Sequence, residues 1–312
     1  MADGRSAARL AKMQGHLAAA NTPRPTAAAG DDVAAVVTPR ALRDWCGRLC
    51  AAAGMPPADV TTLCDMLVEQ ELTQTPKNSH GTRLLQDYLG RMVRDRGEGR
   101  VNPAPRITVQ RSSPTARLYD GDGGLGHIVC AAATEWAIEA AKRNGCASAM
   151  TRNHFHFGAA GHYTRMAARE GCIAMALSSS RGAPQPGAPL SAGVPGPLSL
   201  GVPSAGQRPD FLLDGDVLRV GAFDEAEAST PGYLGTKAKA LGMEAWVHLM
   251  GGVVPGIYLS DVDEDSEFIS NQGSFICVFS PEAFMAPEVY RAEMDRYIGT
   301  VESMEPWPGQ ER

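Results

Sequence analysis

The spacing of hydrophobic residues predicts helices in the first third of the chain. Apolar residues recur every three or four positions after Thr38-Pro39, a favourable pair for starting a helix, and the pattern stops at Gly54. A second helix is predicted to open at Asp59, and a third to cover Leu84 to Val93. The folded part of the chain is therefore expected to begin near Val36 with a helical segment.

From about residue 101 the pattern changes to short strands that alternate with helices. The helices are predicted at 128–144 and 238–250, and the strands at 106–110, 116–119, 147–151, 172–177, 211–213, 217–220 and 274–279. Residues 120–124 and 214–215 have the composition of turns, the second joining two strands of a hairpin. Residues 181–206 are rich in Pro, Gly and Ala and are expected to form a long functional loop. The mixture predicts an α/β protein.

The domain organisation follows from these changes in pattern. Residues 1–35 are expected to be a flexible extension, 36–100 a helical domain completed by about 280–312, and 101–279 a mixed-sheet domain.

Composition and charge exclude several classes of function. The formal net charge of -6 argues against a nucleic-acid partner, and no apolar run is long enough to span a bilayer. The N-terminus has no apolar signal core, so a soluble cytoplasmic protein is expected. The seven cysteines form no CxxC pair, and no structural disulfide is predicted.

The segment from Asn153 to Tyr163 carries the strongest candidate chemistry. Its Gly-Ala-Ala-Gly sequence, residues 158–161, is expected at a helix N-terminus, where unpaired backbone N–H groups favour an anion. A histidine beside such an end can exchange a proton near neutral pH, so His156 is the leading catalytic candidate. The alternative is a histidine packed at the end of a strand and satisfied by the backbone.

The other two histidines of this segment raise the question of a metal. By strand alternation His154 and His156 share one face, with His162 just inside the following helix. The segment contains no carboxylate or cysteine to complete a ligand set, and no metal site is predicted.

A second polar segment, Asn78 to Arg83 followed by Tyr88, combines a hydroxyl, an imidazole, a guanidinium and a phenol. Such groups suit a small anionic substrate, because Arg binds a carboxylate bidentately and His can donate to a carbonyl or hydroxyl. The alternative is a polar loop that leads into a helix, with Ser79 as its cap.

Two further patterns concern phosphate. Lys237 and Lys239, near a predicted helix start, suit a phosphate or are simply solvated. Gly121, Gly123 and Gly126 match GxGxxG, but the preceding strand is short and polar, and the neighbouring aspartates would repel a pyrophosphate. A plain tight turn is therefore expected there, without a Rossmann unit.

Taken in order along the chain, these segments resemble the malate/L-lactate dehydrogenase family that lacks a Rossmann fold. Ureidoglycolate and sulfolactate dehydrogenases and Δ1-piperideine-2-carboxylate reductases belong to that family. The resemblance covers most of residues 36–312. The matching pieces are 78–81 with Tyr88, 120–126, 156–161 (His-Phe-Gly-Ala-Ala-Gly, the most specific), 197–201, 234–237 and 308–311.

The resemblance implies a homodimer with a non-Rossmann mixed sheet for NAD or NADP and a helical N-terminal substrate domain. It implies hydride transfer between the nicotinamide and a small 2-oxo or 2-hydroxy acid, or reduction of a cyclic imine acid. The residues that it assigns are His156 and His80 to proton transfer, Ser79 and Tyr88 to the substrate, and Ser180, Thr236 and Lys237 to the cofactor. Arg83 is a further candidate for binding the substrate, from its own place in the polar segment.

Some positions depart from the family pattern. The family's pocket Arg lies four residues after the His, where this chain has Leu84, and its Thr-Asn after the strand is Ser178-Ser179 here. The stretch before the lysine segment is also shortened. An alternative is therefore a derived biosynthetic enzyme of the same fold that has lost nicotinamide and uses His156 and His80 for cyclisation, dehydration or isomerisation. A third hypothesis is a binding protein that kept the scaffold.

Overall fold

A computed structural model of the chain describes residues 37–73, 81–93, 100–180, 196–204, 210–216, 233–257, 268 and 272–305. The predictions for residues 1–35, for Ser79 and His80, and for a strand at 217–220 lie outside these ranges.

The three helices predicted at the start of the chain are confirmed. They are α2 (Pro39–Ala52), α3 (Pro57–Thr73) and α4 (Leu85–Val93), the last preceded by a single 3-10 turn, η1 (Thr82–Leu84). Thr38 caps α2, because its hydroxyl accepts a hydrogen bond of 3.2 Å from the backbone N–H of Ala41. The second helix begins two residues before Asp59, which lies in its first turn.

The described strands form one seven-stranded mixed sheet at the centre of the molecule, in the order β1-β2-β3-β7-β4-β5-β6. Among these strands β2 and β3 are the one parallel pair of neighbours, and the other adjacent pairs are antiparallel. The strands are β1 (Thr108–Ser112), β2 (Ala116–Leu125), β3 (Cys146–Phe155), β4 (Ile173–Ser180), β5 (Pro197–Val202), β6 (Phe211–Asp216) and β7 (Gln272–Phe279). This arrangement confirms the predicted α/β class and differs from the parallel sheet of a Rossmann domain.

The turn predicted at 120–124 is wrong, because β2 continues through it to Leu125. The strand accommodates the glycines in an irregularity of its pairing with β3 between Asp120 and Gly124. Asp122 and Gly123 have positive φ angles of 50° and 65°. The Asp120 carboxylate accepts from the Asp122 backbone N–H at 3.0 Å, which supports the bulge locally.

Two other local predictions fail where tertiary pairing overrides turn composition. Asp214-Gly215 is not a hairpin turn, because β6 runs through it and pairs with β5. Part of the stretch predicted as a loop, 197–202, is β5, which pairs with both β4 and β6. A paired strand thus forms despite a Pro- and Gly-rich sequence.

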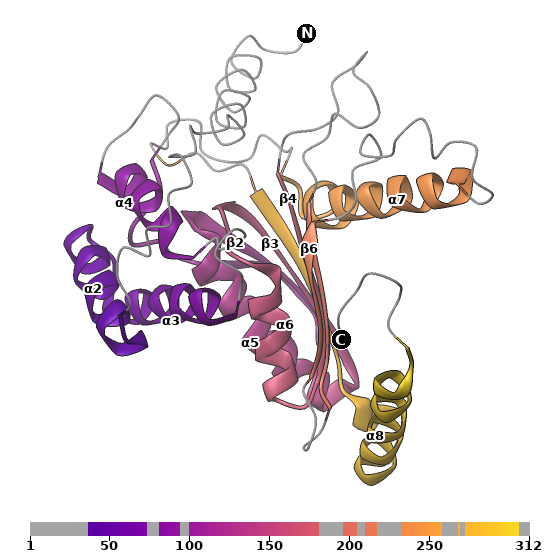
Figure 1. Cartoon of the computed structure of the whole chain (residues 1–312). Coiled ribbons are helices and arrows are strands. Elements are labelled where there is room, and N and C mark those ends of the chain that lie inside the picture. Colours follow the sequence, from indigo (N-terminus) through magenta and orange to yellow (C-terminus); the bar gives the residue numbers. More distant parts are fainter. Residues whose placement is uncertain are drawn as a thin grey trace, which may run out of the picture.

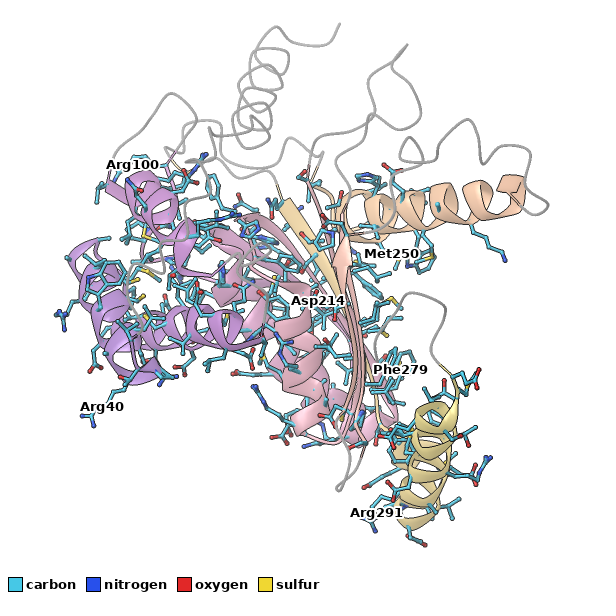
Figure 2. All side chains as sticks on the ribbon, in the orientation of Figure 1. Arg40, Arg100, Asp214, Met250, Phe279 and Arg291 are labelled. Carbon is cyan, nitrogen blue, oxygen red and sulfur yellow. The ribbon has the colours of Figure 1, made fainter. Side chains whose placement is uncertain are left out.

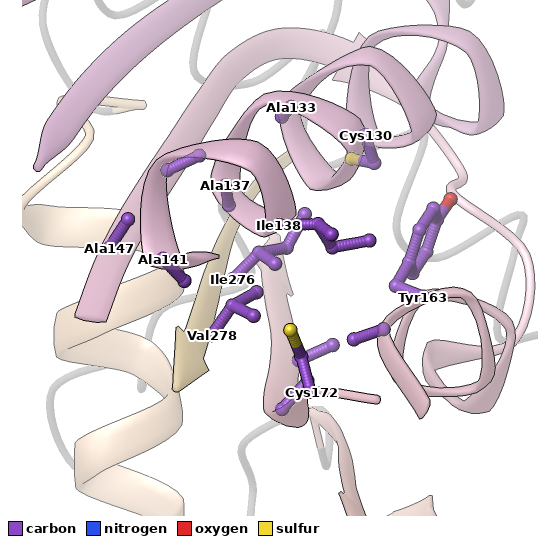
Figure 3. Close-up of a cluster of buried hydrophobic side chains, with 14 of the residues drawn as sticks. Cys130, Ala133, Ala137, Ile138, Ala141, Ala147, Tyr163, Cys172, Ile276 and Val278 are labelled. Atoms are coloured by element: carbon purple, nitrogen blue, oxygen red, sulfur yellow. The ribbon is translucent and has the colours of Figure 1, made fainter. Parts of the chain in front are cut away.

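Two helices cover one face of the sheet (Figure 1): α5 (Gly126–Asn144) and α6 (Ala160–Arg169). Small residues of α5, among them Ala133, Ala137 and Ala141, let the helix lie close to Ile276 and Val278 of β7 (Figure 3). Gly145, with φ of 85°, ends α5 as predicted.

Helices α2, α3 and α4 pack against the start of α5 and the ends of β2 and β3. Their shared core contains Leu85 and Tyr88 from α4, Leu125 from β2, Ile128 from α5 and Phe155 from β3. This core brings α4 to the ends of the parallel strands, which is the arrangement that forms the site described below.

The other side of the sheet carries α7 (Tyr233–His248), a π-helical turn η4 (Leu249–Val253) and α8 (Pro287–Ser303) (Figure 1). Figure 2 shows Met250 where α7 meets the sheet. Helix α7 starts five residues earlier than predicted, so residues 236 and 237 lie within it. Helix α8 lies away from α2–α4 in Figure 1, and the domain division stays a prediction. None of the helices in the described ranges has the length and apolarity needed to cross a membrane.

Candidate acid–base site

His156 lies just beyond the end of β3, where it meets Tyr88 of α4. The Tyr88 hydroxyl is 2.6 Å from Nδ1 of His156, and the two rings are stacked with centroids 6.0 Å apart. The His156 side chain is partly exposed, whereas Tyr88 is buried. Burial, together with the nearby charge of Asp87, raises the pKa of Tyr88, so the phenol stays protonated and is available as a donor.

The proton on the His156 ring can be assigned from its neighbours. The backbone N–H of Gly158 points at Nδ1 from 3.3 Å, and a backbone N–H can only donate. Nδ1 is therefore the acceptor for both Gly158 and Tyr88, and the neutral ring carries its proton on Nε2.

Sequence reasoning missed a further imidazole at this site, that of His127 in the first turn of α5. The ring is fully buried, and neither nitrogen has a hydrogen-bond partner among the described residues. The centroid of the His127 ring lies 5.4 Å from that of the Tyr88 ring and 6.1 Å from that of the His156 ring. Burial, reinforced by the neighbouring histidines, lowers the pKa of His127 well below the usual value, so this ring is neutral. The only sequence signal is a histidine directly after the glycine that starts a helix.

Gly158 shapes this cluster through its backbone. Its φ of +81° suits glycine, and a Cβ there would lie 2.7 Å from Nε2 of His127. The next turn is fixed by the buried Tyr163, whose hydroxyl donates to the carbonyl of Phe157. The backbone of Phe157 and Gly158 is thus constrained by the ring of His127 on one side and by the hydroxyl of Tyr163 on the other.

The prediction that His154 and His156 share a strand face is wrong. Asn153 has a φ of 56°, the pairing of β3 shifts between Thr151 and His154, and β3 ends before His156. His154 is fully buried, donates from Nδ1 to the carbonyl of Phe155 at 2.7 Å, and accepts at Nε2 from the Thr151 hydroxyl at 2.8 Å. Burial lowers the pKa of His154 to about 4, so it is a neutral core residue.

His162 has a separate role in joining α6 to α3. Its Nδ1 hydrogen-bonds to Glu69, which also contacts Arg165 and Arg169. Burial would raise the pKa of Glu69, but the hydrogen bond to His162 and the two guanidinium groups outweigh it and lower the pKa to about 2. Within the described ranges no group of three or more His, Cys, Asp or Glu side chains is arranged to hold a metal ion.

The Gly-Ala-Ala-Gly segment does lie at the N-terminus of α6, which begins at Ala160. A carboxylate of the protein itself is placed beside it, however: a Cβ on Gly161 would lie 2.5 Å from a carboxylate oxygen of Asp214. This helix end is therefore occupied by a carboxylate of β6, and a substrate anion is better sought near His156.

The structure describes only some of the other residues predicted to bind the substrate. Ser79 and His80 fall in 74–80, outside the described residues, but the chain resumes at Gly81 beside α3. There the Glu71 carboxylate accepts from the backbone N–H of Thr82 at 2.8 Å and from its hydroxyl at 2.7 Å. Arg83 follows in η1 with an exposed side chain, whereas Tyr88 is buried against His156. The structure thus brings together Tyr88 and His156 from the predicted set.

The predicted cofactor positions lie at the end of β4 and in α7. Ser180 pairs with Gln272 of β7 in the sheet and is partly exposed. The side chains of Thr236 and Lys237 lie outside the described part of α7. The assignment of Ser180, Thr236 and Lys237 to cofactor binding therefore stays a prediction.

Next to Ser180 the structure shows a polar cluster that sequence reasoning missed. The Ser178 hydroxyl donates to the carbonyl of Gly273, and the Ser179 hydroxyl is 2.8 Å from Nδ1 of His248 in α7. Nε2 of His248 faces Glu244 at 4.0 Å, and this nitrogen and the Oε2 of Glu244 are buried without a hydrogen-bond partner among the described residues. Burial lowers the pKa of His248, which favours the neutral ring.

Among the described strands the mixed sheet has a single parallel pair, and the contact between His156 and the phenol of Tyr88 lies at the end of that pair. A family model described as malate/L-lactate dehydrogenase matches residues 37–215, which is more than half of the chain. The chain belongs to this enzyme family, and the resemblance seen in the sequence is confirmed.

Individual relatives agree with this assignment. The chain is 27% identical to a malate dehydrogenase of Pyrococcus abyssi, over 85% of this chain and 81% of the relative. It is 26% identical to an L-sulfolactate dehydrogenase of Methanocaldococcus jannaschii, over 83% and 81%. The solved malate dehydrogenase of Pyrococcus horikoshii OT3 superposes with a TM-score of 0.72 at 27% identity, covering 91% of this chain and 87% of that one.

Proposed function

We propose that the protein transfers hydride between NAD or NADP and a small carboxylate-bearing substrate. The substrate class is a 2-oxo or 2-hydroxy acid, or a cyclic imine acid. The observation that supports the proposal is the contact between Tyr88 and His156, which places a partly exposed imidazole with a fixed orientation at the end of the parallel strands. The names of the relatives, dehydrogenases of malate and sulfolactate, support a carboxylate-bearing substrate.

His156 would exchange a proton with the oxygen or nitrogen of the reacting double bond through Nε2. Tyr88 and the Gly158 N–H orient the ring from the Nδ1 side. His80, Ser79 and Arg83 complete the proposed substrate pocket, with His80 sharing proton transfer. Because a positioned general acid or base contributes about 10²–10⁴-fold to rate, His156 carries the largest share of the protein's own chemistry.

The residues near Ser180 suit a nicotinamide. Its carboxamide has both a donor and an acceptor, and Glu244 Oε2 and His248 Nε2, which are buried without partners among the described residues, would supply the complementary groups if α7 moved to admit the ligand. Ser180, Thr236 and Lys237 would hold other parts of the cofactor. A bound nicotinamide supplies the hydride donor or acceptor.

Titration of the purified protein with NADH and with NADPH, followed by nicotinamide fluorescence and by calorimetry, tests the proposal. Saturable binding of at least one of them is expected. Glu244→Gln, which keeps the shape of the side chain, should weaken binding, whereas Glu293→Gln on exposed α8 should not. Absence of binding at high excess of both dinucleotides would refute the redox function.

One observation favours the alternative of a biosynthetic enzyme that has lost the nicotinamide. The hydroxyls of Ser178 and Ser179 are both used within the protein, and Gly251 lies so close that a Cβ on it would be 2.8 Å from the Ser179 nitrogen. In that case His156 and His80 would perform cyclisation, dehydration or isomerisation alone. Turnover in cofactor-free buffer that His156→Ala abolishes would support this alternative, and strict dependence on added nicotinamide would eliminate it.

The proposed enzyme is a cytoplasmic homodimer with a small-molecule substrate. Exposed apolar residues on the outer helices support association, among them Trp246 on α7 and Val289, Tyr297 and Val301 on α8. Light scattering is expected to give twice the mass of the chain, and a monomer at micromolar concentration would contradict this part.

A further inference from the structure

His127 is a buried imidazole whose place beside Tyr88 and His156 calls for an explanation. Both of its nitrogens are buried without a hydrogen bond among the described residues, which costs free energy that an apolar residue of similar size would not cost. The other fully buried histidine nearby, His154, has partners on both nitrogens. An unsatisfied polar group that is kept in the core beside reacting groups indicates a role in another state of the site.

The chemistry of His156 identifies that state. For Nε2 to take a proton from a hydroxyl group, it must present a lone pair, so the ring must carry its proton on Nδ1. For Nε2 to give a proton away and leave a neutral ring, Nδ1 must be protonated as well. Every form of His156 that transfers a proton at Nε2 therefore has an N–H at Nδ1, unlike the resting form described above.

A proton on Nδ1 reverses the hydrogen bond with Tyr88. The phenol oxygen, 2.6 Å away, then becomes the acceptor, and the Tyr88 O–H must turn to another acceptor inside the protein. Tyr88 is 3% exposed, so water does not readily replace that acceptor. The plane of the neutral His127 ring makes an angle of 68° with the phenol ring, the two centroids are 5.4 Å apart, and no described residue uses the lone pair of the His127 ring.

We propose that His127 is a positioning residue that accepts the Tyr88 hydroxyl proton in a hydrogen bond whenever Nδ1 of His156 is protonated. The chain of donors then runs from His156 to Tyr88 to His127, and no proton leaves Tyr88. The catalytic meaning of this reversal rests on the proposed function, but the hydrogen-bond change itself does not.

Other titratable groups face this cluster and have their own partners. Asp87 on α4 pairs with Arg91 at 2.9 Å. On β3, His154 is satisfied by Thr151 and a carbonyl, and on α6, His162 is bound to Glu69. These contacts are present whichever way Tyr88 donates. Besides the three rings, the reversal affects only the backbone N–H of Gly158 among the groups described above, because protonated Nδ1 no longer accepts from it.

The test is a pH titration of the full-length protein labelled with ¹⁵N in its histidine rings, followed by NMR. His127→Phe should lower the midpoint of His156 protonation by about one pH unit, because the phenol O–H loses its acceptor. His127→Gln, which supplies an amide oxygen, should recover at least half of that shift. In a Tyr88→Phe background, His127→Phe should leave the midpoint unchanged. An unchanged midpoint in His127→Phe, or an equal shift in the Tyr88→Phe background, would overturn the proposal.

The unsubstituted protein provides a measurement that does not depend on the folding of any variant. As His156 becomes protonated, the signal of one ring nitrogen of His127 should move to the chemical shift of a hydrogen-bonded acceptor. The pH midpoint of this movement should equal the midpoint of His156 protonation. A His127 spectrum that stays constant through that titration would refute the proposal. Neither experiment uses nicotinamide or turnover, so their outcome is distinguishable from a failure of the dehydrogenase proposal.

Discussion

The phenol oxygen of Tyr88 lies 2.6 Å from Nδ1 of His156, although 68 positions separate the two residues in the chain. The helical segment makes this contact because its core is continuous with that of α5. Leu85, Leu125 and Phe155, for example, belong to one buried cluster. The site is therefore assembled by packing between the first helices and the ends of two parallel strands.

Loss of the phenol hydroxyl should affect activity more than stability. Tyr88→Phe removes one buried hydrogen bond, a net loss of about 1 kcal/mol of unfolding free energy, and releases the orientation of His156. A fall of about 10-fold in kcat/KM is expected for the proposed reaction. Tyr290→Phe on α8 is the matched control, because it removes a hydrogen bond from the phenol to the carbonyl of Pro203, away from the site. Equal activity in the two variants would contradict the assignment.

Gly158 should be intolerant of a side chain for two separable reasons. Gly158→Ala introduces both the strain of a positive φ and a Cβ 2.7 Å from His127. Gly171→Ala has a similar φ of +74° with nothing within 4 Å, so it measures the backbone strain alone. Strain should cost about 1 to 2 kcal/mol in urea denaturation, and Gly158→Ala should cost more than Gly171→Ala. If the two costs are equal, His127 does not pack against Gly158 as described.

The Glu69 cluster should make the protein sensitive to strong acid. The folded-state pKa of Glu69 is about 2, below the ordinary value of 4.5, so its stabilising effect is complete above about pH 4.5 and is lost as the pH falls towards 2. The contribution is on the order of 2 to 3 kcal/mol. Glu69→Gln should be less stable at neutral pH and should show a flatter dependence between pH 4.5 and 2. Glu293→Gln, from an exposed pair on α8, should follow the unsubstituted protein.

His154 should contribute to acid sensitivity in a different window. Its pKa is lowered from 6.5 to about 4, so between these values the unfolded chain binds a proton that the folded protein does not. Stability should therefore decrease as the pH falls from about 6.5 to 4. His154→Gln should be less stable at pH 7, and its disadvantage should shrink towards pH 4. A constant difference across this range in chemical denaturation would show that His154 is not buried as a neutral ring.

Much of the fold follows from local sequence signals. Helices α2 and α5 were predictable because a Thr-Pro start and a glycine stop are local features that tertiary contacts leave intact. The sequence of 120–124 was misleading, because its glycines serve a bulge inside a strand that pairs with β3. Asp214-Gly215 failed for the same reason, since pairing with β5 keeps the chain extended.

The site was predictable in part. The His-Phe-Gly-Ala-Ala-Gly segment marked His156, and Tyr88 was singled out by its place in a polar segment. The contact between them depends on long-range packing that no local pattern encodes. His127 was missed because a single histidine in a helix has no distinctive spacing. The pair His248 and Glu244 could not be recognised because its relation to Ser179 depends on the packing of α7 against the sheet.

The most direct test of the central claim is the turnover of His156→Gln. The unsubstituted enzyme should consume NADH or NADPH in the presence of at least one member of a panel of 2-oxo acids and cyclic imine acids. His156→Gln should bind the dinucleotide normally but turn over about 10²–10⁴-fold more slowly. Undiminished turnover in His156→Gln would show that this imidazole does not transfer the substrate's proton.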